Sequence, residues 1–331
     1  MVKILITAVP FGELDREVLN LLSRNSRIEF NVNTFGRKLT EQELIGVISG
    51  YDIVIAGTET YTRRVMENAP KLKLISRVGI GLDSVDLEAA DELGIIVSYT
   101  PDAPAPAVAE LTIAQMINLS RKLPLADRKL REGQWKRYSG LRLSKSVIGI
   151  IGTGRVGSIV LKHLQTFNPE KIFVNDIVPN FDFYRKYNAE LVEKEIIYKE
   201  SDIITLHIPL TNATYKLISK KEMYLMKKNV CLINTSRGAI INEEDLYEYL
   251  FNNPLASVAL DVFEKEPYKG ILTMLDNCIF TCHMGSMAED CRINMEMEAA
   301  KEAIRFVNGE SLKNLVTEEA RRFQFKRLSD H

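Results

Sequence analysis

Two of the four histidines stand where an apolar, strand-like run of residues ends. His207 closes the run Leu206-His207-Ile208-Pro209, and His283 follows Phe280-Thr281-Cys282. The carboxyl ends of parallel strands open onto the ligand crevice of an α/β protein, and imidazole exchanges protons near neutral pH. Each of these two is therefore a candidate proton donor, with a purely structural role as its alternative. His163 lies in a helix-like stretch and His331 is the last residue, so we expect neither of them to take part in chemistry.

Charged side chains follow two further apolar runs. Arg237 comes just after the run Leu232–Asn234, and its fixed fork of donors suits two-point binding of a carboxylate, although a salt-bridging or capping role is equally typical. Asp261, Glu264 and Glu266 follow the run that ends at Leu260. A carboxylate beside a histidine would orient the imidazole, whereas an acid-rich loop is more often simply solvated.

A glycine-rich turn is the most informative motif. The apolar run Val147–Ile151 leads into Gly152, Gly154 and Gly157, spaced as G-x-G-x-x-G, and a helical pattern follows. Such a turn brings a pyrophosphate against backbone amides at a helix N-terminus. Asp176 ends the next predicted strand, near the spacing expected of a carboxylate that binds the adenine ribose. The motif predicts a dinucleotide site, and the carboxylate favours NAD over NADP because it would repel a 2′-phosphate.

Two weaker patterns remain open. In Arg77–Asp86, Gly79 and Gly81 could expose backbone amides to an anion, but a plain strand-to-helix turn, capped by Ser84 or Asp86, fits equally well. Three cysteines and His283 cluster near the C-terminus. If Cys278–Cys282 is a strand, its ends lie roughly 13 Å apart, too far to share one zinc ion, so we predict no metal site.

These candidates require elements that place them at one edge of a sheet. Short, nearly continuous apolar runs alternate with helix-like stretches, which is typical of parallel strands buried on both faces. We therefore predict an α/β fold, doubly wound. The runs are Val2–Ile6, Ile53–Ala56, Leu72–Val78, Ile95–Ser98, Val147–Ile151, Ile172–Asn175, Ile203–His207, Val230–Asn234, Val258–Leu260 and Cys278–Thr281.

Composition sets the wider limits. The 331 residues suggest two domains, and a net charge of -1 argues against a nucleic-acid partner. The sequence holds no apolar run long enough to span a bilayer and no signal-like start, and four clustered cysteines favour a reducing, cytoplasmic setting. The proline-rich stretch Thr100–Pro106 predicts a stiff connection, and Val108–Leu143 predicts a helix kinked or divided at Pro124. That stretch, with Trp135, is either an ordinary helix pair or an arm that meets a partner subunit.

Taken together, the motifs resemble the D-isomer-specific 2-hydroxyacid dehydrogenases, the family that includes phosphoglycerate dehydrogenases, D-lactate dehydrogenases and glyoxylate/hydroxypyruvate reductases. The likeness runs from about Leu72 to Gly309. It rests on the following segments in order: Arg77–Asp86, Val108–Thr112, Gly133–Trp135, Gly152–Gly157, Leu206–Leu210, Asn234–Gly238, Asp261–Pro267 and His283–Ser286.

The resemblance implies roles for three side chains. His283 would be the acid/base, Glu266 would hold its imidazole protonated, and Arg237 would bind the substrate carboxylate and polarise the keto oxygen. The backbone amides of Val78 and Gly79 would hold the rest of the carboxylate. His207 would then line the cofactor site. The cofactor-binding residues implied are Thr112, Gly152, Gly154, Arg155, Val156, Gly157, Asp176, His207, Pro209, Thr214, Thr235, Ser236, Arg237, Asp261, His283 and Gly285.

The chain departs from the family pattern near the catalytic histidine. Cys282 stands where the family usually has proline, Ser84 where asparagine is common, and Ala107 where serine often precedes Val108. None of these changes removes a catalytic group.

The resemblance also implies a discontinuous domain structure. A flavodoxin-like substrate domain would comprise residues 1–99 and 288–331, and an NAD-binding Rossmann domain residues 100–287, with the active-site cleft and two hinges where they meet. The arm at about 108–143 would form a homodimer. The about 45 residues after His283 are expected to be too few for an additional regulatory domain.

The sequence thus predicts an NAD-dependent oxidoreductase (EC 1.1.1.-) that acts on a small D-2-hydroxy acid or its 2-keto acid. The alternative is an NAD(H)-sensing binding protein of the corepressor type, which would retain the same three residues. The scarcity of basic residues in Val9–Glu13 and Ala56–Tyr61 weakly disfavours a phosphorylated substrate.

Overall fold

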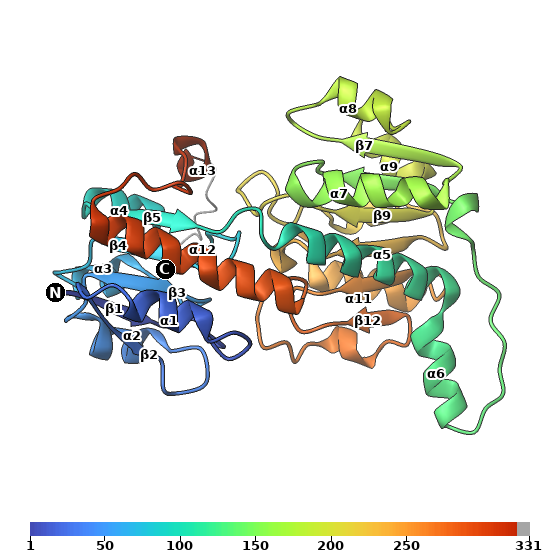
Figure 1. Ribbon diagram of the computed structural model, residues 1–331. Coiled ribbons are helices and arrows are strands. Elements are labelled where there is room, and N and C mark those ends of the chain that lie inside the picture. Colours follow the sequence, from blue (N-terminus) through green and yellow to red (C-terminus); the bar gives the residue numbers. More distant parts are fainter. Residues whose placement is uncertain (323–331) are drawn as a thin grey trace. The chain divides into compact units, whose positions relative to one another are not determined.

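The computed structural model describes residues 1–322 of the chain (Figure 1). These residues form two compact units. Unit 1 comprises Met1–Pro104 together with the described residues from Met287 onward, and unit 2 comprises Ala105–Ser286. The second unit is therefore inserted into the first. His331 lies outside the described residues.

Unit 1 is built on a five-stranded parallel sheet. Its strands are ordered β2 (Ile28–Val32), β1 (Val2–Ile6), β3 (Ile53–Ala56), β4 (Leu74–Arg77) and β5 (Ile96–Tyr99). Alternate residues of each strand face opposite sides, so the sheet has an apolar surface on both faces. Its helices are α1 (Glu17–Ser23), α2 (Glu41–Ile48), α3 (Arg63–Glu67), α4 (Leu87–Glu92), α12 (Glu289–Asn308) and α13 (Glu318–Arg322).

Helices cover both faces of this sheet. On one face, Leu5, Val54 and Ile75 pack with buried residues of α2, α3 and α4. On the other face, Ile4 and Ile55 pack with buried residues of α1 and of α12, the long helix that follows the inserted unit. Unit 1 is thus a three-layer, doubly wound α/β structure with the flavodoxin-type strand order.

Unit 2 contains a seven-stranded parallel sheet with helices on both faces. The order is β12 (Cys278–Phe280), β11 (Ser257–Leu260), β10 (Cys231–Asn234), β9 (Ile203–Leu206), β6 (Val147–Ile151), β7 (Lys171–Asn175) and β8 (Glu190–Leu191). Its helices are α5 (Ala105–Arg121), α6 (Leu123–Arg131), α7 (Arg155–Leu164), α8 (Phe181–Lys186), α9 (Lys194–Glu200), α10 (Lys220–Met223) and α11 (Glu243–Asn252).

The strand order reverses between β6 and β9. From β6 the chain proceeds to β7 and β8 on one side, and β9 then starts on the other side and leads towards β12. Helices α5 and α7 pack on one face of the sheet, and α9, α10 and α11 on the other. Ligand crevices form at such reversals, at the carboxyl ends of the strands. The reversal therefore directs attention to the residues that follow Ile151 and Leu206.

All ten predicted strands are present, and the predicted α/β fold is confirmed. The sequence analysis missed β2 and β8. Both are edge strands whose residues, apart from Ile28, are exposed or half-buried, so neither shows the continuous apolar run of a central strand.

The helical stretch after the proline-rich connection differs from its prediction. Helix α5 begins at Ala105, so Pro106 lies in its first turn, where a missing N–H costs nothing. The break falls at Lys122, whose φ of 53° is left-handed, and Pro124 stands at the start of α6. Helix α6 ends at Arg131. The prediction of a helix up to Leu143 is therefore wrong for residues 132–142, which are not helical.

Candidate functional site

The glycine-rich turn connects β6 to α7 with little space around two of its glycines. Gly152 has φ +92°, and a Cβ there would lie 2.5 Å from the carbonyl oxygen of His207. A Cβ on Gly157 would overlap the carbonyl oxygen of Gly152. Gly154 is different, because nothing lies within 4 Å of its Cβ position. The space above Gly154, at the N-terminus of α7, is where a pyrophosphate can approach the backbone.

Asp176 stands at the end of β7, directly beside this turn. One of its carboxylate oxygens, Oδ2, accepts from the backbone N–H of Thr153 at 2.6 Å and from its hydroxyl at 2.9 Å. The other, Oδ1, accepts from the Val178 amide at 2.9 Å. A carboxylate fixed in this way retains lone pairs for ribose hydroxyls. Ile177 and Val178, 86% and 70% exposed, offer apolar surface next to it.

The residues that surround the turn therefore suit a dinucleotide. Arg155 is exposed at the first position of α7, and Val156 is partly buried beside it. Pro209 and Thr214 belong to one tight loop after β9, in which the Thr214 hydroxyl donates to the Pro209 carbonyl at 2.7 Å. All of these residues lie at the carboxyl edge of the unit 2 sheet.

His207 follows β9 at the same edge, but its environment does not favour proton transfer. Burial of the ring lowers its pKa to about 3, although the residue keeps partial exposure at the sheet edge. Its Nε2 lies 3.0 Å from the Thr205 hydroxyl. The imidazole is thus neutral at physiological pH, and His207 cannot act as a general acid there.

His283 and Glu266 form a pair in unit 2. His283 follows β12, and its Nδ1 lies 2.8 Å from Oε2 of Glu266. The other carboxylate oxygen of Glu266 accepts from the Phe263 amide at 3.0 Å. Burial alone would raise the pKa of Glu266, but the His283 hydrogen bond and charge, the Phe263 amide and the charge of Arg237 together lower it below its usual value. The carboxylate is therefore ionised and oriented, and it leaves Nε2 of His283 available for a ligand.

Arg237 stands on the loop after β10, close enough to Glu266 for its charge to lower the pKa of that carboxyl. Its guanidinium donates to the Ser236 carbonyl at 2.6 Å. The loop is ordered by Asn234, whose side chain donates to the Arg237 carbonyl and accepts from the Ser236 amide and hydroxyl. A Cβ on the next residue, Gly238, would overlap the backbone of Phe263, so the Arg237 and Glu266 loops lie against each other.

Asp261 organises the loop that carries His283. Its side chain is 2% exposed, and Oδ1 accepts from the Thr281 hydroxyl at 2.6 Å and the Met284 amide at 2.9 Å. Oδ2 accepts from the Gly285 amide at 2.8 Å, and the Asp261 carbonyl accepts from the His283 amide at 2.7 Å. These four bonds hold residues on both sides of His283, whose φ of 51° lies in the left-handed region. A loop without the family's usual proline is thus fixed by a buried carboxylate.

Thr112 and Thr235 lie deeper in unit 2. The Thr112 hydroxyl donates to the Val108 carbonyl at 2.8 Å and lies 3.1 Å from that of Thr235. Both are buried, so they link α5 to the loop that carries Arg237. Gly285 connects to the same helix, because a Cβ on it would approach Val108 and Asp261.

The sequence of this site matches the family profile described as D-isomer specific 2-hydroxyacid dehydrogenase, NAD binding domain, over residues 113–285. This segment is about half of the chain and carries the glycine turn, Asp176, Arg237, Glu266 and His283.

The chain belongs to the D-isomer-specific 2-hydroxyacid dehydrogenase family.

Relatives extend the similarity beyond the cofactor domain. A glyoxylate reductase of Thermococcus litoralis is 36% identical over 277 residues, which cover 81% of this chain and 83% of that protein. A D-3-phosphoglycerate dehydrogenase of Methanocaldococcus jannaschii is 37% identical over 96% of this chain, but the chain spans only 59% of that relative's length. A D-lactate dehydrogenase structure from Aquifex aeolicus, solved with NAD and lactic acid, has a TM-score of 0.83 at 26% identity, covering 95% of this chain and 98% of that one.

The cofactor of this chain is NAD, because the matched segment is the family's NAD-binding domain. The open space above Gly154, the helix N-terminus and the Asp176 carboxylate fit that group. Metal ligands are a separate question. Within residues 1–322, no group of three or more His, Cys, Asp or Glu side chains could hold a metal ion.

The two residues of unit 1 that are predicted to bind the substrate carboxylate, Val78 and Gly79, donate their backbone amides to acceptors within the protein. The Val78 N–H donates to the Ala56 carbonyl at 2.9 Å, and the Gly79 N–H donates to the Thr100 hydroxyl at 2.7 Å. Gly79 has φ +137°, a conformation that favours glycine. A carboxylate bound by these amides would have to replace the present acceptors. Asp86, one of the two predicted caps, does cap α4 by accepting from the Ala89 amide at 2.9 Å.

The sequence analysis missed several residues that support the site. Asn234 and Thr281 order the loops of Arg237 and His283, and Tyr184 contacts the Thr153 hydroxyl at 2.6 Å beside the glycine turn. Asn234 and Thr281 each end a predicted strand, and this position could have identified them as site residues. Tyr184 lies within an unremarkable helix, and no local pattern marks it.

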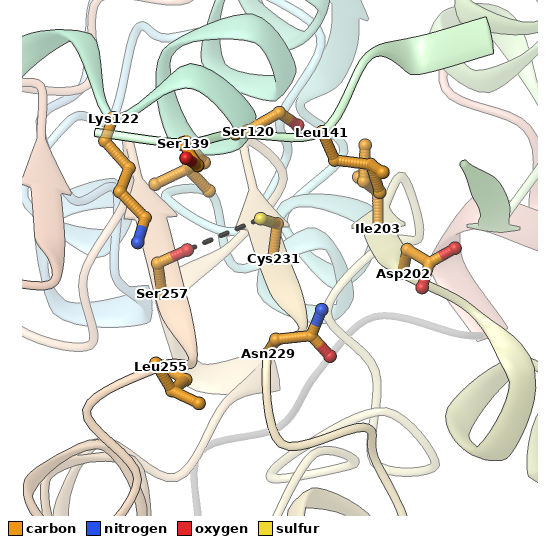
Figure 2. Close-up of a pocket in the computed structure, with 12 residues that line it drawn as sticks. Ser120, Lys122, Ser139, Leu141, Asp202, Ile203, Asn229, Cys231, Leu255 and Ser257 are labelled. Atoms are coloured by element: carbon orange, nitrogen blue, oxygen red, sulfur yellow. Dashed lines mark hydrogen bonds between the residues drawn. The ribbon is translucent and has the colours of Figure 1, made fainter. Parts of the chain in front are cut away.

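A cavity of this family member lies away from these residues. It has a volume of about 300 Å³ and is lined by the amino ends of β9, β10 and β11 and by the carboxyl end of α5 (Figure 2). Cys231 points into it and lies 3.4 Å from the Ser257 hydroxyl. The strand ends that line it are opposite to those that carry the glycine turn, so this cavity does not belong to the cofactor site.

In the part of the chain that the structure describes, we find no helix both long enough and apolar enough to cross a membrane.

Proposed function

We propose that this protein catalyses hydride transfer between NAD(H) and a small D-2-hydroxy acid or its 2-keto acid. The observation that carries the proposal is the His283–Glu266 pair beside Arg237, at the edge of the sheet that also carries the glycine turn. The relatives named above are reductases and dehydrogenases, which supports an enzyme over an NAD(H)-sensing protein of the corepressor type.

Each side chain has a defined task in this reaction. Bound NADH supplies the hydride that adds to the carbonyl carbon of the keto acid. Arg237 binds the substrate carboxylate and stabilises the negative charge that develops on the carbonyl oxygen. His283 gives its Nε2 proton to that oxygen, while Glu266 holds the ring through Nδ1 and stabilises its protonated form. In the direction of oxidation, His283 removes the hydroxyl proton instead.

We further propose the roles of the two units. Unit 2 binds NAD through Gly152–Gly157 and Asp176, and Thr112, His207, Pro209, Thr214, Thr235 and Ser236 line its site. Unit 1 is the substrate domain, where the Val78 and Gly79 amides bind the substrate carboxylate in exchange for their present partners. Asp261 and Gly285 position His283 next to the nicotinamide.

The protein is proposed to work as a cytoplasmic homodimer without a nucleic-acid partner. Helix α6 supports the dimer, because none of its residues is buried and its apolar side chains Leu123 and Leu130 are 46% and 55% exposed. Trp135, just beyond it, is 80% exposed. A soluble monomer rarely exposes such large apolar residues together, which favours a partner surface over a free helix pair.

The test is the loss of NADH absorbance with a panel of glyoxylate, hydroxypyruvate, pyruvate, bulkier 2-keto acids and phosphohydroxypyruvate. We expect turnover of at least one of these, and a loss of about a thousandfold or more in kcat for His283→Ala and in kcat/KM for Arg237→Ala. His163→Ala, a histidine outside the site, is the control and should retain activity.

A wild-type protein that binds NADH tightly, yet turns over none of the panel, would replace this proposal with the NADH sensor. Equal Michaelis constants for NADH and NADPH would contradict the role proposed for Asp176.

A further inference from the structure

Two side chains lie behind the Asp176 carboxylate, and both belong to unit 2. Thr153 is the residue between Gly152 and Gly154 of the glycine turn, and Tyr184 lies within α8. Tyr184 is 2% exposed, whereas Thr153 and Asp176 are half-buried. The three side chains therefore lead from the interior of the unit to the surface where the dinucleotide is proposed to bind.

The hydrogen bonds among these three side chains run in one direction. The Thr153 hydroxyl has a single proton, and it donates this proton to Oδ2 of Asp176 at 2.9 Å. The same hydroxyl oxygen lies 2.6 Å from the hydroxyl of Tyr184. Because the Thr153 proton is already used, the tyrosine is the donor of that second bond. The chain of donors thus runs from Tyr184 through Thr153 and ends on the negative carboxylate.

The same contacts prevent the Asp176 carboxylate from turning. Oδ2 also accepts from the Thr153 amide at 2.6 Å, and Oδ1 accepts from the Val178 amide at 2.9 Å. Rotation of the side chain would break both Thr153 bonds at once, and hydrogen bonds to a charged acceptor are stronger than those between neutral groups. The carboxylate is therefore held in one orientation, and Oδ1, which accepts from the single donor, is the oxygen with room for a ribose hydroxyl.

Packing fixes Tyr184 itself. Its ring belongs to the apolar core of unit 2 that also contains Ile150 and Val174. The Phe183 ring lies edge-on to it, with ring centroids 6.4 Å apart. The Asn180 side chain caps α8 by accepting from the Phe183 amide at 3.1 Å. The Tyr184 hydroxyl therefore reaches the glycine turn from a capped and packed helix.

A fixed carboxylate matters for the choice between NADH and NADPH. The 2′-hydroxyl of NADH can donate to Oδ1 of Asp176, whereas the 2′-phosphate of NADPH carries negative charge that the carboxylate repels. An aspartate that is free to rotate can turn away from the phosphate and so tolerate NADPH. The bonds from Thr153 oppose that movement, so the repulsion is retained.

We propose, on the basis of the cofactor site proposed above, that Thr153 and Tyr184 are positioning residues that hold Asp176 against the adenine ribose and thereby exclude NADPH. Both side chains act through the Asp176 carboxylate. The G-x-G-x-x-G pattern leaves the position of Thr153 open and does not include α8. This contribution to cofactor choice therefore depends on two hydroxyl groups that the motif itself does not require.

The experiment measures the Kd of the full chain for NADH and for NADPH by fluorescence titration, so it requires no turnover. We expect the wild type to bind NADH at least about tenfold more tightly than NADPH. Thr153→Val removes the hydroxyl at nearly constant volume and should reduce this preference by about tenfold, the effect of one hydrogen bond to a charged group. Thr153→Ser keeps the hydroxyl and should keep the preference. Tyr184→Phe should shift the Kd ratio in the same direction as Thr153→Val, but less, because Thr153 can still donate to Asp176.

A double variant tests whether Tyr184 acts through Thr153. Thr153→Val combined with Tyr184→Phe should have the same Kd ratio as Thr153→Val alone, because the bond that Tyr184 supports is already absent. This variant removes both hydroxyls together, so its ratio decides the question should Thr153→Val alone not fold. Tyr187→Phe is the matched control, because it removes the hydroxyl of a half-buried tyrosine at the C-terminal end of α8 and should leave both Kd values unchanged.

The Kd ratio separates a positioning role from a merely structural one. If Thr153→Val and the double variant weaken both dinucleotides equally, or leave both Kd values unchanged, the inference is overturned. Additive effects of the two substitutions overturn the role given to Tyr184. A wild type that binds NADH selectively but reduces no keto acid contradicts the proposed reaction and leaves this inference standing, whereas a protein that binds neither dinucleotide overturns both.

Discussion

At the scale of single residues, the site separates two histidines that the sequence leaves equivalent. Both follow strands of the same sheet, but burial holds His207 neutral, while His283 has an ionised carboxylate on Nδ1. The difference depends on Glu266, which is distant from both in sequence, and on how deeply each ring is buried. Neither the carboxylate partner of a histidine nor the depth at which its ring is buried can be read from the residues next to it.

Glu266 leads to a prediction about pH. Its pKa is lowered in the folded chain, so its contacts stabilise the fold above the ordinary glutamate pKa and are lost as the pH falls through the lowered value. Glu266→Gln should therefore reduce the acid dependence of unfolding. It should also lower kcat for reduction and move the pH optimum to lower pH, because the protonated imidazole loses its carboxylate. The measurements are urea unfolding and kcat, each followed from about pH 4 to about pH 9. A pH optimum identical to the wild type would argue that Glu266 does not act on His283.

Asp261 leads to a prediction about position. Asn can keep only part of the bonding to Thr281, Met284 and Gly285, so Asp261→Asn should loosen the loop of His283. We expect kcat to fall by about a hundredfold, since displacement of a catalytic group by about 1 Å has that effect, while the KM for the keto acid changes little. Steady-state kinetics check this split. Asp182→Asn, the same change at an exposed position of α8, should leave both constants as in the wild type.

At the scale of elements, the glycine turn is the part of the site that the sequence predicts best. Its function depends on residues close in sequence, on a strand, a turn and a helix N-terminus, and each of these has a local signal. The loops of Arg237 and His283 are different. The Arg237 loop is ordered by Asn234 within three residues, but it also packs against the backbone of Phe263. The His283 loop depends on the buried Asp261, whose partners lie 20 or more residues away, so the geometry of both loops required the folded sheet.

The central strands were also predictable, because burial on both faces demands continuous apolar residues. The edge strands β2 and β8 lack that demand and were missed. The break between α5 and α6 falls at Lys122 rather than at Pro124, since proline fits a helix start and Lys122 adopts the left-handed conformation. Local preference alone does not reveal such a residue.

The glycines of the turn lead to a paired prediction. Gly154→Ala has room for its methyl group, so it should lose less thermal stability than Gly157→Ala. The methyl group would occupy the space of the pyrophosphate, so NADH should bind at least about tenfold more weakly. Gly157→Ala should lose both stability and NADH binding, because its methyl group would overlap the Gly152 carbonyl. Thermal melts and NADH titration by fluorescence distinguish the two. Equal NADH affinity in Gly154→Ala and the wild type would place the pyrophosphate elsewhere.

At the scale of the whole molecule, unit 2 interrupts unit 1 after Pro104, and the chain returns to unit 1 at Met287. Each unit has its own sheet, its own two apolar cores and its own reversal of strand order. The proposed roles of the units follow from this: unit 2 carries the cofactor turn and the His283–Glu266 pair, and unit 1 is proposed to be the substrate domain.

The exposed arm leads to a prediction about assembly. We expect light scattering to give a homodimer at micromolar concentration, and Leu130→Asp combined with Trp135→Ala to give a monomer, because a charge would then enter an apolar interface. Leu93→Asp, at an exposed apolar position in unit 1, should remain dimeric. A wild-type monomer under these conditions would contradict the proposed role of α6.

The most direct test of the proposed reaction follows the hydride itself. Wild-type protein would be incubated with NADH that carries deuterium on the transferred position of the nicotinamide, together with glyoxylate or hydroxypyruvate, and the product would be examined by mass spectrometry and chiral chromatography. We predict that the product carries the deuterium on C2, that the hydroxypyruvate product has the D configuration, and that His283→Ala forms neither product at a comparable rate. A product without deuterium on C2, or equal turnover by His283→Ala, would contradict hydride transfer assisted by the His283–Glu266 pair.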